Sequence, residues 1–259
     1  MCPGAARLVN GEGSWLRRGH LVCHCLLVET SAGLVLVESG LGTGDIADPK
    51  RLGRMFLTAS RPKLRPSETA LHQVQSLGFS AADVRHVVVT HLDVDHAGGI
   101  ADFPQAQIHV SVAEKNAAER GHLRYIREQL AQAPKWATHE ISGERWFGFD
   151  AVRAVEHTDG EVLLVPLYGH SEGHCGVAVR TDDGWILHAG DAFFHRWQLQ
   201  GRRPPLGLAV FQRVVDHDRA LRVANQRRLV DLAREHGDEV RIVNAHDPVM
   251  LQQCQHAAA

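Results

Sequence analysis

Hydrophobic residues along the chain gather in short runs that are rich in Val, Leu and Ile. Runs of this length, bounded by Gly, Pro, Asn and Asp, are typical of β-strands. Because such runs recur from one end of the chain to the other, we expect a single domain over residues 1–259. The predicted strands lie at residues 21–29, 33–39, 85–90, 106–110, 161–167, 176–180, 185–190 and 240–245.

Three segments between these runs carry helix signals. Ser67 is placed to cap a helix that stops at a glycine, and Ser111 with Glu114 forms an S-x-x-E capping box. A third segment carries Leu229 and Leu232 on one face and also ends at a glycine. The predicted helices span residues 67–78, 111–121 and about 216–236.

Two polar stretches lack a clear period and are predicted to be long loops. Residues 48–68 are rich in Pro and Arg, and residues 195–207 form a similar excursion. Strand runs that come first as a hairpin, and later alternate with helices, indicate a layered α/β structure rather than a pure β-sandwich.

The composition narrows the class of partner. The 259 residues are 44% hydrophobic and 22% charged, the net charge is -2, and Lys and Arg are spread along the chain. Because no basic surface for nucleic acid or anionic lipid is indicated, we expect a small-molecule substrate. No run approaches the roughly 18 apolar residues of a membrane span, and no signal-peptide core is visible, so a soluble, cytoplasmic protein is predicted. A homodimer is left open.

The cysteines indicate reduced thiols rather than a disulfide framework, because the five are odd in number and scattered. Cys23 and Cys25, in the stretch VCHC, look like a pair of thiolate metal ligands. Strand alternation places both on one face and His24 on the other. Buried thiols in the core are therefore the preferred interpretation of this pair.

Histidine is the unusual residue of the composition, at 18 against 2 tyrosines. Each of four strand-like runs is followed or ended by a stretch that combines histidine with an acidic residue. Since α/β folds assemble ligand sites at strand ends, we expect the four stretches to meet. Imidazole nitrogens and carboxylate oxygens are suited to two divalent ions with shared ligands. The stretches are HLDVDH at 91–96, GHSEGH at 169–174, HAGDAFF at 188–194 and NAHDP at 244–248.

Together, these stretches resemble the metal-binding motifs of the metallo-β-lactamase superfamily in their order and approximate spacing. His91, Asp93, Asp95 and His96 are similar to its H-x-H-x-D-H signature, with Asp93 in place of the middle histidine. The resemblance covers about residues 20–250. It implies a four-layer αββα sandwich, in which two sheets pack face to face between helices, with a dinuclear metal site at one edge.

The resemblance also implies a set of metal ligands. Asp191 would bridge two ions, and Asp95 would also hold or accept a proton. The first ion would be bound by His91, Asp93 and His170, and the second by Asp95, His96 and His246. Four neighbouring residues would orient these ligands, namely Thr90, His174, His188 and Asp247.

The implied cofactors are two divalent metal ions, with zinc the favoured element. A carboxylate at Asp93 is a harder ligand than an imidazole, so manganese or iron gains relative to zinc at the first position. The flavodiiron reductases of this superfamily also carry an acidic residue there. They pair the domain with a flavin module, and no flavodoxin-like segment is present in this sequence.

Among hydrolases, the chain is most similar to the N-acyl homoserine lactonase branch. This resemblance implies that a hydroxide bridging the metals attacks an ester or a lactone, with Asp95 and Asp191 as catalytic residues. Those lactonases place a tyrosine shortly after the bridging aspartate to stabilise the oxyanion. Here Phe193 and Phe194 occupy that region, so the role is either missing or taken by His195, which is the predicted catalytic candidate.

Some alternatives stay open at this point. Phe56, Phe193 and Phe194 either line the substrate pocket or belong to the core. A di-iron redox protein on the same fold is the rival from a different class. A phosphodiesterase, a β-lactam hydrolase and a non-catalytic metal-dependent sensor are further alternatives.

Overall fold

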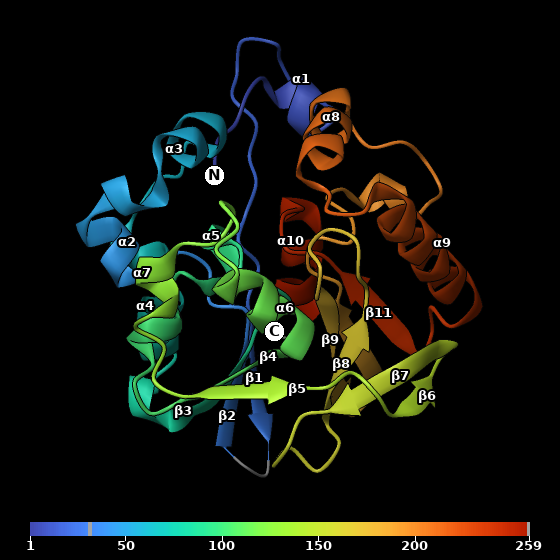
Figure 1. The fold of residues 1–259 in the computed structure, drawn as a ribbon. Helices are drawn as coiled ribbons and strands as arrows, with labels where there is room; N and C mark the ends of the chain where they lie inside the picture. Colours follow the sequence, from blue (N-terminus) through green and yellow to red (C-terminus); the bar gives the residue numbers. More distant parts are fainter. Residues whose placement is uncertain (31–32, 258–259) are drawn as a thin grey trace.

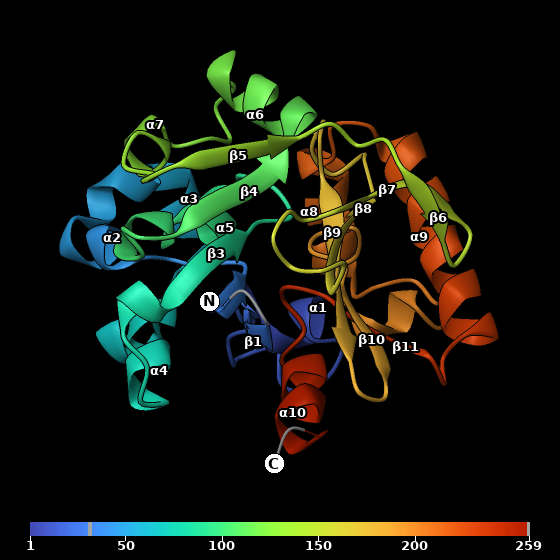
Figure 2. The same ribbon diagram turned by 90° about the horizontal axis from the view of Figure 1, so that it is seen from below.

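Two β-sheets face each other, and helices cover the outer side of each sheet, in a computed structural model that describes residues 1–30 and 33–257 (Figures 1 and 2). This is the predicted αββα sandwich. It arises because the strands carry apolar residues on both faces, so each sheet has to be covered on both sides.

The first sheet has the strand order β1-β2-β3-β4-β5. Strands β1 and β2 pair antiparallel, whereas β2, β3, β4 and β5 run parallel to one another. Parallel strands end at the same edge of a sheet, so the segments that follow them come together there. The strands are β1 (Leu26–Thr30), β2 (Gly33–Val37), β3 (Val84–Val88), β4 (Gln107–Ser111) and β5 (Trp136–His139).

The second sheet has the strand order β11-β10-β9-β8-β7-β6. Its strands are antiparallel to their neighbours except for β10 and β11, which run parallel. Both of these end at the edge where the metal motifs follow them. The strands are β6 (Glu144–Trp146), β7 (Phe149–Ala154), β8 (Val162–Pro166), β9 (Cys175–Thr181), β10 (Gly184–His188) and β11 (Val240–Val243).

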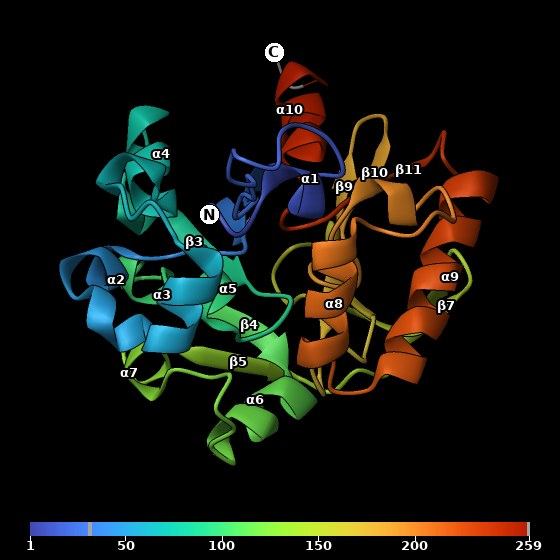
Figure 3. The same ribbon diagram turned by 90° about the horizontal axis from the view of Figure 1, so that it is seen from above.

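The helices form the two outer layers of the sandwich. Helices α2, α3, α4, α6 and α7 lie on the side of the first sheet, whereas α8 and α9 lie on the side of the second (Figures 2 and 3). In the described residues, no helix has the length and hydropathy to cross a membrane. The α-helices are α1 (Ala6–Val9), α2 (Thr43–Ala47), α3 (Arg54–Ser60), α4 (Ala70–Ser76), α5 (Val94–Ala97), α6 (Val112–Glu119), α7 (Arg127–Leu130), α8 (Leu206–Val215), α9 (Arg219–Glu235) and α10 (Pro248–Ala257).

Separate apolar clusters hold the layers together. The cluster between the two sheets contains Val35, Val88 and Val177, one from each of three strands. Two further clusters lie outside the sheets, one under α4 and α6 and one under α9, where Leu229 and Leu232 are buried as predicted. Burying each of these side chains contributes about 1.5–3 kcal/mol to folding.

The N-terminal part of the chain differs from the prediction. The first strand pairs only from Leu26 onward, because residues 21–25 leave the first sheet and run toward the second. There, the His24 amide donates to the Ala245 carbonyl at 2.9 Å. The segment 48–68, predicted to be a loop, contains α3 and two 3-10 turns, Pro49–Leu52 and Pro66–Glu68.

The predicted helix 67–78 begins later, at Ala70. Its cap is Thr69, whose hydroxyl accepts from the His72 amide at 3.2 Å, because Ser67 is used in a 3-10 turn. The prediction at α6 is half confirmed. The Ser111 hydroxyl accepts from the Glu114 amide at 3.1 Å, but the Glu114 carboxylate turns away from the cap toward the metal motifs.

Three strands were not predicted, namely β5, β6 and β7, and neither were the ten-residue helices α8 and α10 or the shorter helices α1, α2, α3, α5 and α7. Strands β5 and β6 are edges of their sheets, and edge strands are short and carry polar residues, which weakens their signal. Helix α8 is rich in apolar residues, and Leu206, Val210 and Val214 on one of its faces are exposed, so its apolar residues do not mark a buried face.

Three buried histidines follow one another across the first sheet on the face toward the second sheet. His86 Nδ1 lies 2.9 Å from His109 Nε2, and His109 Nδ1 lies 2.9 Å from His139 Nε2. Burial, followed by the charges of its two neighbours, lowers the pKa of His109 to about 3. Burial also lowers the pKa values of His86 and His139. All three are therefore expected to be neutral in the folded protein near neutral pH.

This row of histidines predicts a loss of stability in acid. Below about pH 6.5 the unfolded chain protonates these imidazoles while the folded protein resists, so the free energy of unfolding falls as pH drops from 6.5 toward 3. For His109 the slope is about 1.4 kcal/mol per pH unit. Urea unfolding of metal-free protein at several pH values should show a flatter dependence in His109→Gln. Equal slopes in the two proteins would contradict this assignment.

Candidate metal centre

The first metal motif lies in the loop that leaves β3 and in the short helix α5. This loop packs closely on the segment that follows β2, which requires glycines. A Cβ atom on Gly98 would lie 2.3 Å from Asp45 Oδ2, and one on Gly99 would lie 2.5 Å from the Ser39 carbonyl oxygen. Only glycine avoids such contacts. The Gly pair after the motif therefore lets α5 pack closely against the end of the sheet, where the other metal motifs also lie.

One group of ligand atoms comes from His91, His170 and Asp191. The three atoms lie within 4.8 Å of one another, and all three residues are buried. Asp191 Oδ2 lies 3.4 Å from His170 Nε2 and 3.9 Å from His91 Nε2. The residues follow β3, β8 and β10, so the group exists only where both sheets end.

A second group comes from Asp95, His96 and His246, again within 4.8 Å of one another. Asp191 Oδ1 lies 3.1 Å from His246 Nε2 and 3.5 Å from His96 Nε2. Oδ2 of Asp191 thus lies near both histidines of the first group and Oδ1 near both histidines of the second, while His246 Nε2 also lies 3.3 Å from Oδ2. This is the arrangement expected of a carboxylate shared between two metal ions.

The chemistry of these residues fits divalent cations. Nε2 of His91 and Nε2 of His96 are buried without a hydrogen-bond partner, and such atoms are costly unless something binds them. Burial by itself would raise the pKa of Asp191, but His246 and His96 lower it well below its usual value. Asp191 is therefore ionised, and it is available as an anionic ligand.

Contacts at the Nδ1 atoms orient the imidazoles so that Nε2 faces the centre. Thr90 Oγ1 lies 2.9 Å from His91 Nδ1, and the Val22 carbonyl oxygen lies 2.8 Å from His246 Nδ1. A metal-binding histidine usually has such a partner on its other nitrogen. Thr90 thus has the orienting role that was predicted for it.

Glu38, which sequence reasoning missed, orients His96. One oxygen of its buried carboxylate contacts His96 Nδ1, and the other accepts from the Thr90 amide at 2.6 Å. Burial would raise the pKa of Glu38, but His96 lowers it to about 2. Conversely, burial would lower the pKa of His96, whereas Glu38 and Asp191 raise it well above its usual value. The two groups form a buried ionic hydrogen bond.

Glu114 is a second residue that the sequence did not reveal as part of the site. Its carboxylate accepts from the Leu92 amide at 3.0 Å, the Ser171 hydroxyl at 2.6 Å and the Gly173 amide at 3.0 Å. It therefore connects the loop of His91 to the loop of His170. Its only signal was an acidic residue in the first helical turn, which was interpreted as part of a cap.

Of the other three residues predicted to orient the ligands, one is hydrogen-bonded to a predicted ligand and two have partners elsewhere. His174 Nε2 accepts from the Asp191 amide at 3.0 Å, so it supports the shared ligand directly. His188 Nε2 lies 2.9 Å from the His24 carbonyl oxygen. Asp247 accepts from the Arg196 amide at 2.8 Å and pairs with its guanidinium, which anchors the loop after Phe194.

Asp93 is the one predicted ligand outside the two groups of described residues, although its Oδ2 lies 3.4 Å from His91 Nε2 and 3.2 Å from His170 Nε2. Its carboxylate is paired with Arg124, whose Nε and Nη2 lie 2.6 and 2.7 Å from the two oxygens. Burial would raise the pKa of Asp93, but Arg124 and then His91 lower it well below its usual value. The aspartate is ionised and already has a cation beside it.

His195, predicted to stabilise an oxyanion, makes contacts of another kind. Its Nδ1 accepts from the Trp197 amide at 3.2 Å, and its Nε2 lies 3.2 Å from the Asn10 carbonyl oxygen. These bonds connect the 3-10 turn Arg196–Gln198 to the N-terminal segment. The structure does not bring His195 into contact with the metal-ligand groups among the described residues.

The three phenylalanines that were candidates for the substrate pocket lie in three different environments. Phe193 is fully buried in the core under α9. Phe194 lies against the metal ligands, since its ring stacks on His246 with centroids 5.3 Å apart and meets His170 edge-on at 5.8 Å. Phe56 lies half-buried on α3.

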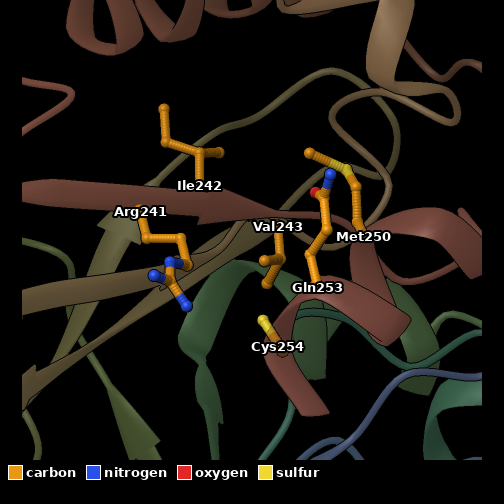
Figure 4. Close-up of a pocket in the computed structure, with 6 residues that line it drawn as sticks. All are labelled: Arg241, Ile242, Val243, Met250, Gln253 and Cys254. Atoms are coloured by element: carbon orange, nitrogen blue, oxygen red, sulfur yellow. The ribbon is translucent and has the colours of Figure 1, made fainter. Parts of the chain in front are cut away.

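Two cavities are lined by residues other than the predicted metal ligands. One of about 300 Å³ lies between β11 and α10, beside Arg241 and Cys254 (Figure 4). Another of about 690 Å³ is bordered by α4 and the segment that carries Cys23 and Cys25. Burial, followed by Asp95, raises the pKa of Cys23 to about 12. Neither thiol joins a metal-ligand group in the part of the chain that the structure describes. Both residues are partly buried, precede β1 and line this cavity, so they are not the fully buried strand residues that were predicted.

Comparison with known proteins agrees with this arrangement. Residues 18–218 match the family described as the metallo-beta-lactamase superfamily. The chain is 45% identical over 238 residues to a probable metallo-hydrolase of Mycobacterium tuberculosis, covering 90% of this chain and 76% of the relative. It is 25% identical over 185 residues to an N-acyl homoserine lactonase of a Bacillus species, covering 71% and 68% of the two chains.

A similar solved structure shows the same fold. An N-acyl homoserine lactone hydrolase, with the product N-hexanoyl-L-homoserine at its catalytic metal center, matches with a TM-score of 0.73 and 22% identity, covering 98% of this chain and 92% of the other. The paired sheets, the two groups of histidine and aspartate ligands and these likenesses lead to one conclusion. The chain is a member of the metallo-β-lactamase superfamily and a probable metal-dependent hydrolase.

Proposed function

We propose that the protein hydrolyses an ester or a lactone of a small molecule, with two divalent ions, zinc foremost, as cofactors. The observation that carries this proposal is the position of Asp191, whose carboxylate lies within 4 Å of histidine nitrogens from both groups of ligands. Two divalent ions held by these residues would supply an activated water near neutral pH and would polarise the carbonyl group under attack. The similarity to a lactonase at the level of sequence supports the choice of substrate.

The side chains around the centre have distinct tasks in this proposal. Asp191 and His174 fix the geometry of the centre through the bond from the Asp191 amide to His174 Nε2. Asp95, whose side chain is 12% exposed, is the carboxylate that can accept a proton from water and deliver it to the leaving alcohol. His195 is given no catalytic task, because both of its ring nitrogens contact the backbone.

An apolar wall indicates what part of the substrate lies beside the centre. Phe194 stacks on His246, and Phe211 of α8 meets Phe194 edge-on with centroids 5.7 Å apart. Phe211 is 42% exposed, and Leu206, Val210 and Val214 continue the exposed apolar surface along the same helix. We therefore expect the acyl group of the substrate to be apolar.

An assay panel tests the proposed reaction. Protein loaded with zinc, manganese or iron should hydrolyse aryl esters and lactones faster than phosphodiesters or β-lactams, and longer acyl chains should be preferred over acetyl. Metal-free protein serves as the control, and it should be inactive until metal is added back. Silence across the whole panel, together with oxygen consumption by the iron-loaded protein, would refute hydrolysis and favour the di-iron redox alternative.

A further inference from the structure

Arg124 lies at the first metal position and is buried there by surrounding residues. It belongs to the segment between α6 and α7, which is anchored by the buried ring of Tyr125. Its guanidinium meets the Asp93 carboxylate as a fork, with both oxygens engaged. Nη1 also donates to the His170 carbonyl oxygen at 2.8 Å. The side chain is only 14% exposed, so these contacts hold it in one place.

The guanidinium also reaches a metal-binding atom. Nη2 of Arg124 lies 2.9 Å from His170 Nε2, the nitrogen that faces Asp191. Arginine has only donors, so this contact uses the Nε2 lone pair, which is the same lone pair that a metal ion needs. When Nε2 instead carries the proton, it faces Asp93 Oδ2 at 3.2 Å. In both tautomers His170 Nε2 therefore has a hydrogen-bond partner in the protein. A metal ion can bind this nitrogen only after Arg124 moves away or Nε2 loses its proton.

The two metal positions consequently differ in charge. The position of Asp95, His96 and His246 has an uncompensated carboxylate of its own and shares Asp191. At the other position the charge of Asp93 is cancelled by Arg124, which stays protonated in proteins. Among the described residues, a divalent ion there would have Asp191 as its only uncompensated anionic partner, and a fixed positive charge would lie beside it.

We propose that Arg124 is an internal competitor for the first metal position, so that the protein binds one divalent ion tightly at Asp95, His96 and His246 and a second ion more weakly at His91 and His170. The inference concerns the metal centre of the proposed hydrolase. Arg124 acts here by engaging Asp93 and His170. An arginine that merely supported Asp93 as a ligand would have the opposite effect on the weaker position.

Titration of the metal-free protein with Zn²⁺, in competition with a chromophoric chelator, tests the proposal. The wild type should bind two ions with dissociation constants that differ by about tenfold or more, as expected for one charged contact. In Arg124→Gln the weaker step should tighten by about tenfold, because Asp93 and His170 Nε2 are released. The tighter step should not change, and it also reports that the variant is folded.

Arg120→Gln is the matched control. Arg120 lies four residues earlier and pairs with Glu172 at the surface, where both side chains are exposed. Its loss removes the same charge from the same region without touching a ligand, so both steps should stay as in the wild type. Two equal steps in the wild type, or a weaker second step in Arg124→Gln, would overturn the proposal. The metal titration uses no substrate, so its outcome does not depend on whether the protein hydrolyses any compound of the assay panel.

Discussion

The variant Asp191→Asn is expected to lose roughly a thousandfold in kcat/KM. Asp191 is the only carboxylate within 4 Å of Nε2 in all four histidines of the two ligand groups, at distances of 3.1 to 3.9 Å among the described residues. Asparagine keeps the shape but removes the negative charge that both positions share. A bound metal supplies several kcal/mol of transition-state stabilisation, and each 1.4 kcal/mol is a factor of ten in rate.

Metal analysis and kinetics on one preparation measure this effect. Metal content per chain should fall together with activity in Asp191→Asn, while the circular dichroism spectrum stays that of the wild type. Asp45→Asn is the matched control, since Asp45 is as deeply buried but bonds to the Gly42 amide and Gln129 rather than to a ligand. Normal metal content and turnover in Asp191→Asn would show that the centre is built differently.

Glu38→Gln is expected to weaken the tighter metal position by about 10- to 100-fold, the usual effect of losing a partner that orients a ligand. The glutamine oxygen has to accept from the Thr90 amide, as a carboxylate oxygen does now. Its amide group then faces His96 Nδ1 and donates to it. The imidazole proton moves to Nε2, which is the atom that has to bind the metal.

The same chelator competition measures this change, and the nitrogen chemical shifts of the imidazole reveal the tautomer. Ser39→Ala is the control, because the Ser39 hydroxyl donates to the backbone carbonyl of His96 at 2.7 Å and does not touch the ring. It should cost some stability without changing metal affinity. If Glu38→Gln binds metal as the wild type does, the contact between Glu38 and His96 has no role in holding the ligand.

The sequence was sufficient for the fold and for the position of the metal centre. Strands are visible because their apolar runs are local, and the metal motifs are visible because each lies next to the strand that delivers it. Strand ends in such folds meet at one edge, so His91, His96, His170 and His246 were expected to converge. The structure brings their ligand atoms together around Asp191.

Sequence patterns were insufficient where a contact joins distant parts of the chain. Glu38 lies 58 residues before His96, and Arg124 lies 31 residues after Asp93. Neither has a spacing or a neighbour that marks it, since glutamate after a strand and arginine before a helix are ordinary surface residues. Their roles depend on a burial that only the packed loops create.

Asp93 shows the difference most clearly. Its place in the motif predicted a metal ligand, because a carboxylate next to three ligands is suited to that task. In the folded chain its carboxylate lies beside two of the predicted ligands and is also paired with the guanidinium of Arg124, which packing brings to it. The sequence determines which groups are available at the edge of the sandwich. The tertiary structure decides which of them are satisfied by the protein itself, because hydrogen bonds and charge pairs depend on distances of a few ångströms that no linear spacing contains.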